Sequence, residues 1–204
     1  CDREPAATCL TAEEVGVLEK WYAGPRDASG RQLYPGGIPR GSEPHWPLWL
    51  TGQPSARIPG LVPLFAQDPP RLAHMGAIYN SDNPDLSAYA ARGGKLIVYH
   101  GWADPIVTPW RTLQYVEDVQ RRMGGPSQTD SFLRLFMLPG FDHCGMQTGP
   151  GANDAGFDPL PALEAWVERG VAPDSIPSAR IGADGAVQWS RPVCTYPESA
   201  GCGP

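Results

Sequence analysis

Residues 92–104 read Arg-Gly-Gly-Lys-Leu-Ile-Val-Tyr-His-Gly-Trp-Ala-Asp, and this stretch decides the fold class. A nearly continuous apolar run follows two glycines, which is typical of a buried strand in a parallel sheet. A second run of this kind, Phe-Leu-Arg-Leu-Phe-Met-Leu at 132–138, leads into Pro-Gly-Phe-Asp-His-Cys at 139–144. Each run therefore ends in a turn that carries a polar side chain, Asp104 in the first turn and His143 in the second.

Helical patterns separate and follow these two runs. Between them, Thr108 is placed to cap a helix that Gly-Gly at 124–125 ends. After them, a helix is predicted from Leu160 to Gly170, with Leu163, Trp166 and Val167 completing its apolar face. The order strand, helix, strand, helix predicts an α/β fold with a parallel sheet.

The first part of the chain has a different texture. Thr11 and Glu14 form a capping-box pattern for a helix that Gly24 ends. Residues 23–65 then carry many prolines and glycines, and we predict mostly irregular chain there. So long a connection is usually a functional lid or a linker, and its tryptophans favour a packed lid.

Composition excludes several partner classes. The 204 residues have a net charge of -6 and no basic run, which argues against nucleic acid. No apolar stretch is long enough to cross a bilayer, so no membrane association is expected. The chain begins at Cys1 without a Met, and we expect it to be a processed or excised piece.

Five cysteines suggest an oxidising compartment, which means a secreted or periplasmic protein. Cys1 and Cys9 are close in sequence, as are Cys194 and Cys202, and each pair is expected to form a local disulfide. Cys144 is left without a partner. A metal site is the rival interpretation, but no CxxC pair or second His at ligand spacing supports it.

Asp104 and His143 are the candidates for chemistry. In an open parallel sheet, reactive groups collect beyond the carboxyl ends of the strands, and both residues follow such ends. An Asp and a His in this order occupy the last two places of the α/β-hydrolase triad. The alternatives are an ordinary turn residue and a structural His. His100 competes with His143, but its place at the end of a buried strand predicts a structural hydrogen bond, and His45 and His74 have no recognisable context.

A nucleophile is not found. The chain contains no G-x-S-x-G, and neither Ser42 nor Ser55 follows a predicted strand. We discount Cys144 as a nucleophile, because side chains adjacent in sequence rarely have the geometry for proton transfer.

Several motifs stand in a telling order along the chain. The most specific are His-Gly-Trp-Ala-Asp at 100–104 and His-Cys at 143–144. Weaker ones are Cys-Leu-Thr at 9–11, Tyr-Ala-Gly-Pro at 22–25, Tyr-Pro-Gly at 34–36, Gly-Ser-Glu at 41–43 with Trp46, Asn-Pro-Asp-Leu at 83–86, Arg-Gly-Gly-Lys-Leu-Ile at 92–97, Phe-Met-Leu-Pro-Gly at 136–140, Trp-Val-Glu at 166–168 and Arg-Pro-Val-Cys at 191–194. In this order they resemble the C-terminal half of the tannase and feruloyl esterase family, which includes the hydrolase of mono(2-hydroxyethyl) terephthalate.

This resemblance implies a fold and a domain division. It implies the C-terminal part of an α/β-hydrolase fold at 92–204, and part of an irregular, Pro/Gly-rich lid at 1–91. Trp46, Trp49 and Phe65 become candidates for contacting an aromatic acyl group, with packing inside the lid as the alternative. The structural calcium loop of the family would lie upstream of Cys1, so no cofactor and no metal ligand are expected here.

The resemblance also implies roles for the site residues. Asp104 would be the triad acid and His143 the base. Cys144 would pair with a cysteine that precedes the nucleophilic Ser, both lying outside this chain. The expected function is serine-type hydrolysis of esters of aromatic acids through an acyl-enzyme, with this chain alone inactive. Its expected partners are the ester and the N-terminal half of the same protein, with Cys144 as the candidate link to that half. The alternative is a non-catalytic homologue or fragment that only binds an aromatic ligand or a partner chain.

Overall fold

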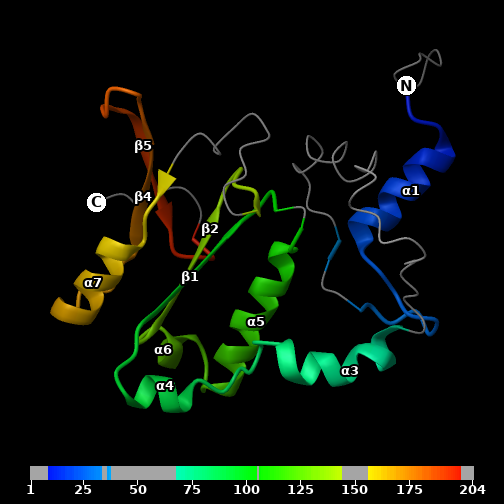
Figure 1. Ribbon diagram of the computed structural model, residues 1–204, viewed down its shortest axis with the longest axis horizontal. Helices are drawn as coiled ribbons and strands as arrows, with labels where there is room; N and C mark the ends of the chain where they lie inside the picture. The colour runs from blue at the N-terminus through cyan, green and yellow to red at the C-terminus, as the bar shows by residue number, and fades with distance from the viewer. Residues whose placement is uncertain (1–8, 34–35, 38–67, 105, 144–155, 199–204) are drawn as a thin grey trace.

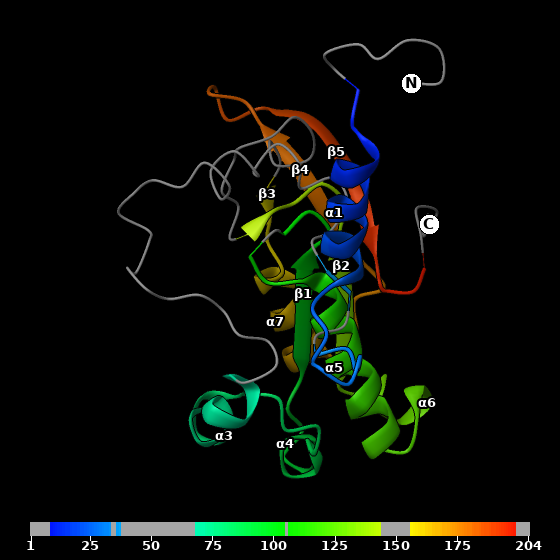
Figure 2. The same ribbon diagram turned by 90° about the vertical axis from the view of Figure 1, so that its right-hand side faces the viewer.

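The computed structural model describes residues 9–33, 36–37, 68–104, 106–143 and 156–198. Its centre is a parallel pair of strands, β1 (Leu96–Gly101) and β2 (Leu133–Leu138). In both views, α5 (Pro109–Arg122) lies on one side of this pair and α7 (Leu160–Arg169) on the other (Figures 1 and 2). Figure 1 shows the strands that follow α7 on its side of the pair. The predicted α/β class is confirmed.

The register of β1 and β2 sets the geometry of everything that follows them. Leu96 is opposite Leu133 at the start, and Gly101 is opposite Leu138 at the end. Both strands therefore finish at the same level. Because they are parallel, their two exit turns emerge side by side at one edge of the sheet.

Strand β2 divides the core, because alternate side chains of a strand point to opposite faces. Leu133, Leu135 and Met137 join a cluster with residues of α5, while Phe136 and Leu138 join a second cluster with Ile176 and Val193. Both faces of β2 are thus covered, and its continuous apolar sequence has a physical reason. Strand β1 is less buried than its sequence predicts: Tyr99 is 52% exposed, because among the described residues β1 pairs with β2 alone.

Helix α5 connects β1 to β2 and follows the predicted pattern, with Leu113, Val116 and Val119 buried. Pro109 occupies its first turn, where a missing N–H costs nothing. Thr108 holds the N-cap position as predicted, but its side chain makes no capping hydrogen bond.

Helix α7 ends at Gly170, whose left-handed conformation (φ 72°) suits a residue without a side chain. Trp166 is its buried contact, and the guanidinium of Arg134 on β2 lies 5.2 Å from the centre of the indole ring. Leu160 and Val167 were expected on the same apolar face, but both are exposed. The buried face of α7 is narrower than its sequence indicates, because it packs through a single large ring.

The sequence did not predict the second sheet. Strands β3 (Gly156–Phe157), β4 (Ser175–Ile181) and β5 (Val187–Cys194) form an antiparallel sheet in that order. Prolines inside β4 and β5 hide the strand pattern. Pro177 and Pro192 lie directly opposite each other. In an antiparallel sheet, every second pair of opposite residues makes no hydrogen bond with each other, so two prolines can form such a pair. A bridge from Phe136 to Thr195 joins β2 to the chain after β5.

The described residues of the N-terminal part include three helices. Helix α1 (Ala12–Ala23) has the predicted capping box between Thr11 and Glu14 and ends at Gly24. Helices α3 (Asp68–Tyr79) and α4 (Ser87–Ala91) were not predicted. The α5 cluster also contacts three residues that precede the predicted domain boundary at 91/92, namely Leu86, Tyr89 and Ala90. The position of that domain boundary stays a prediction. Within the described residues, no helix combines the length and apolar character needed to cross a bilayer.

Candidate active site

Asp104 lies in the turn that follows β1 and is almost completely buried. The turn is fixed to the neighbouring strand end, since the Trp102 N–H donates to the Leu138 carbonyl and the Ala103 N–H to the Phe141 carbonyl. One carboxylate oxygen, Oδ1, accepts the backbone N–H groups of Ile106 and Val107 at 2.8 and 2.9 Å. The carboxylate is therefore held by backbone on one side, and its second oxygen faces the exit of β2.

His143 lies beyond the exit of β2 and meets that second oxygen. Its Nδ1 is 2.9 Å from Oδ2 of Asp104, although the two residues are 39 positions apart in the sequence. The side chain is 31% exposed, so part of the ring can be reached from outside. The structure thus brings together the two residues that sequence reasoning selected.

Gly101 allows the two turns to approach so closely. A Cβ atom at this position would lie 2.2 Å from the carbonyl oxygen of Phe141, a backbone atom that cannot move aside easily. The absence of a side chain at the end of β1 lets the chain that carries His143 pass against it.

His100 also contacts the acid, which sequence reasoning missed. The predicted structural hydrogen bond exists, because Nδ1 lies 2.7 Å from the Thr112 hydroxyl on α5. Its other nitrogen, Nε2, lies 3.1 Å from Oδ2 of Asp104 and 3.0 Å from the Val107 carbonyl. The only sequence signal was the spacing of four residues between His100 and Asp104.

The electrostatics of the site follow from these contacts. Burial by itself would raise the pKa of Asp104. Hydrogen bonds from the His100 ring, the Val107 N–H, the His143 ring and the Ile106 N–H outweigh burial and lower the pKa to about 2. Asp104 is therefore a carboxylate at neutral pH.

The protonation of His143 follows from that charge. A carboxylate only accepts hydrogen bonds, so Nδ1 of His143 carries the proton and donates it to Asp104. The lone pair of the neutral ring is then on Nε2, on the side away from the acid. Such a ring can take a proton from a hydroxyl group or water and return it later.

The other predicted site residues outside the described part of the chain are Cys1, Trp46, Trp49, Phe65, Cys144 and Cys202. Ser42 and Ser55, which sequence reasoning did not select as nucleophiles, lie there too. Cys9 and Cys194 are each disulfide-bonded, and their pairing with Cys1 and Cys202 stays a prediction. No described Ser side chain hydrogen-bonds to His143, and no group of three metal-ligating side chains occurs among the described residues.

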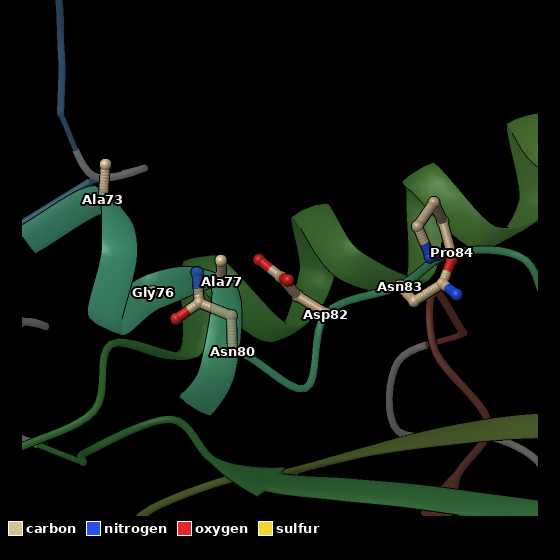
Figure 3. A pocket seen from close by; sticks show the side chains of 7 residues that line it. All are labelled: Ala73, Gly76, Ala77, Asn80, Asp82, Asn83 and Pro84. Carbon is tan, nitrogen blue, oxygen red and sulfur yellow. The ribbon is translucent and has the colours of Figure 1, made fainter.

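A cavity of about 710 Å³ lies elsewhere, between α3 and the segment before α4 (Figure 3). Its polar lining includes Asp82, whose carboxylate is paired with Arg111 at 2.6 Å. Neither Asp104 nor His143 lines this cavity, so it is not the place of the Asp–His pair. The other lining residues are Ala73, Gly76, Ala77, Asn80, Asn83 and Pro84.

Three relatives show how widely the sequence likeness extends. The chain is 41% identical over 121 residues to a probable feruloyl esterase of Arthroderma benhamiae, which covers 59% of this chain and 22% of the relative. It is 41% identical over 124 residues to the mono(2-hydroxyethyl) terephthalate hydrolase of Piscinibacter sakaiensis, covering 60% and 19%. An uncharacterized esterase of Xanthomonas campestris is 30% identical over 262 residues, covering 98% of this chain and 45% of its own length. The chain thus spans less than half the length of these relatives.

Fold comparison agrees. The crystal structure of feruloyl esterase B from Aspergillus oryzae matches with a TM-score of 0.71 and 27% identity, over 97% of this chain and 45% of that one. The family description "Tannase and feruloyl esterase" matches residues 62–202, which include β1, β2, Asp104 and His143. The resemblance seen in the sequence is confirmed, and the chain belongs to the tannase and feruloyl esterase family.

Proposed function

We propose that this chain supplies the acid and the base of a serine-type carboxylic ester hydrolase that acts on esters of aromatic acids. The observation that carries the proposal is the 2.9 Å contact between Asp104 Oδ2 and His143 Nδ1. It lies at the edge of the sheet where β1 and β2 end opposite each other. The names of the relatives, feruloyl esterase and terephthalate monoester hydrolase, support an aromatic acyl group.

The mechanism follows from the ring geometry. Nε2 of His143 takes the hydroxyl proton of the nucleophilic Ser while the Ser oxygen attacks the ester carbonyl carbon. The imidazolium then gives that proton to the leaving alcohol, which leaves an acyl-enzyme. In the second step the same nitrogen takes a proton from water, whose oxygen attacks the acyl carbon. The bond between that carbon and the Ser oxygen breaks, the imidazolium returns the proton to the Ser oxygen, and the aromatic acid is released. Asp104 keeps the ring in the Nδ1–H form and stabilises its positive charge.

The proposal places the Ser outside residues 1–204, next to a cysteine that pairs with Cys144. The partner is then the segment that carries this Ser. Trp46, Trp49 and Phe65 are the proposed contacts for the aromatic acyl group. The protein is proposed to be secreted or periplasmic, and the disulfide-bonded Cys9 and Cys194 support an oxidising compartment.

The test starts from the protein isolated from its source, with every attached chain. Its intact mass is measured with and without reductant, and a fluorophosphonate probe labels any activated Ser. We expect reduction to release a labelled polypeptide linked through Cys144, or a single longer chain to carry the label. A mass of 22.0 kDa, one free thiol, no label and no hydrolysis of methyl ferulate would support the non-catalytic alternative.

The role of the base is tested in the same protein. His143→Ala should lower kcat for methyl ferulate by a factor of about 10⁴, as expected when a triad member is lost. His74→Ala is the matched control, because His74 is exposed on α3 and has no hydrogen bond to Asp104, His100 or His143 among the described residues. Purified residues 1–204 should be inactive. Hydrolysis by them well above the His143→Ala background would show that the chain needs no external Ser.

A further inference from the structure

We infer that His100 is a positioning residue for the acid–base pair: its ring N–H holds Oδ2 of Asp104, so that the carboxylate keeps His143 in its Nδ1–H form. The inference rests on the proposed function, because it assigns His100 a place in the same reaction. It concerns a histidine on strand β1 whose two ring nitrogens both have partners within the protein, Thr112 and Asp104.

The protonation of His100 follows from its neighbours. Nε2 faces the Asp104 carboxylate and the Val107 carbonyl, which both only accept hydrogen bonds. The proton must therefore be on Nε2. Nδ1 of the neutral ring is then an acceptor, and the Thr112 hydroxyl donates to it at 2.7 Å. One direction of donation results, from Thr112 through His100 to Asp104.

These contacts leave the carboxylate with no freedom to turn. Its Oδ1 accepts two backbone N–H groups and its Oδ2 accepts two ring N–H groups, from His100 and His143. Val107 closes the arrangement, because its N–H donates to Asp104 while its carbonyl accepts from His100. Without His100, Oδ2 would keep one partner among the described residues, and that partner is the ring that must move a proton during the reaction.

The rigidity of His100 comes from the elements around it. Its backbone is fixed in β1 opposite Met137, and Thr112 belongs to the first half of α5. The side chain is 12% exposed, and that of Asp104 is 5% exposed. A hydrogen bond shielded from water in this way is strong. Among the hydrogen bonds that lower the pKa of Asp104, the one from His100 has the largest effect.

The experiment compares two substitutions of similar size. His100→Leu removes both nitrogens, whereas His100→Gln keeps an N–H donor at the distance of Nε2 from the backbone. In the active protein that contains this chain, we expect His100→Leu to lower kcat about 10- to 100-fold with little change in KM. Losses of this size follow when outer partners of functional histidines are removed. His100→Gln should restore most of the rate.

A second readout does not need activity. In the ¹⁵N-labelled protein that contains this chain, nitrogen shifts report which atom of each neutral ring carries the proton. The wild type should show His100 protonated on Nε2 and His143 on Nδ1. In His100→Leu, the Nδ1–H share of His143 should fall, and in His100→Gln it should recover.

Three results would overturn the inference: an unchanged kcat in folded His100→Leu, a His100→Gln variant as slow as the Leu variant, or His100 carrying its proton on Nδ1. If His100→Leu fails to fold, the wild-type nitrogen shifts decide. If no form of the protein hydrolyses esters, the proposed function fails by itself, and the proton positions still test what His100 does.

Discussion

At the scale of the residue, Asp104 organises the site because its two carboxylate oxygens accept hydrogen bonds from different kinds of donor. Its Oδ1 accepts the backbone N–H groups of Ile106 and Val107. Its Oδ2 accepts from two side chains, that of His100 on β1 and that of His143 in the chain beyond the exit of β2. The strand-end rule was enough to predict the contact with His143. It could not reveal the contact with His100, because that contact depends on how the turn folds back over β1.

The ionisation of Asp104 makes a prediction about pH. Its pKa is lowered from 3.8 to about 2 in the folded protein, so folding favours the charged form. The stability this adds is complete above pH 3.8 and is lost as pH falls through about 2, a difference of about 2 kcal/mol. Asp104→Asn should weaken the dependence of unfolding free energy on pH in this window. Urea unfolding at a series of pH values measures it.

Asp27 and Asp85 serve as the internal reference for that measurement. The pKa of each is also lowered to about 2, Asp27 chiefly by its hydrogen bond with Ser29 and Asp85 chiefly by that with Ser87. Some acid sensitivity will therefore remain in the variant. Identical pH profiles for Asp104→Asn and wild type would contradict the hydrogen-bonded state described for Asp104.

At the scale of the element, the exit of β1 must accommodate the exit of β2. Gly101→Ala would place a methyl group against the backbone carbonyl of Phe141. We expect a loss of about 1–3 kcal/mol of stability from the strain. We also expect loss of the Asp104–His143 hydrogen bond, visible as a change in the His143 ring nitrogen shifts. Gly156→Ala is the matched control, because its nearest atom would be an ordinary 3.7 Å contact.

Sequence patterns predicted the elements unequally, and the reasons are physical. Strand β2 was predicted because a strand buried on both faces has a continuous apolar sequence. Helix α5 was predicted because a helix buried along one stripe has apolar residues at helical spacing. The β4–β5 hairpin was not, because Pro177 and Pro192 break that pattern while still fitting opposite each other. The outward positions of Leu160 and Val167 depend on how α7 is rotated, which periodicity alone does not fix.

At the scale of the whole molecule, β2 connects two clusters that do not share a face. Leu135 belongs to the α5 cluster and Phe136, its neighbour, to the β4–β5 cluster. Leu135→Ala and Phe136→Ala should each cost about 2–5 kcal/mol, the usual range for emptying a core position. Because one strand serves both clusters, each substitution should lower a single common transition, with circular dichroism and tryptophan fluorescence coinciding. Two separated transitions would show that the clusters unfold independently.

The acid and the base belong to one continuous piece of chain, and this has a consequence in polymer terms. Their hydrogen bond closes a loop of 39 residues that contains α5 and α6 (Pro126–Thr129). The entropy of closing a flexible loop grows only with the logarithm of its length, about 0.6 kcal/mol for each doubling. Extra residues inserted at the exposed turn around Gly124 would therefore lengthen the chain between Asp104 and His143 at a small cost in stability. The pairing of β1 with β2 would keep the two side chains at the same separation.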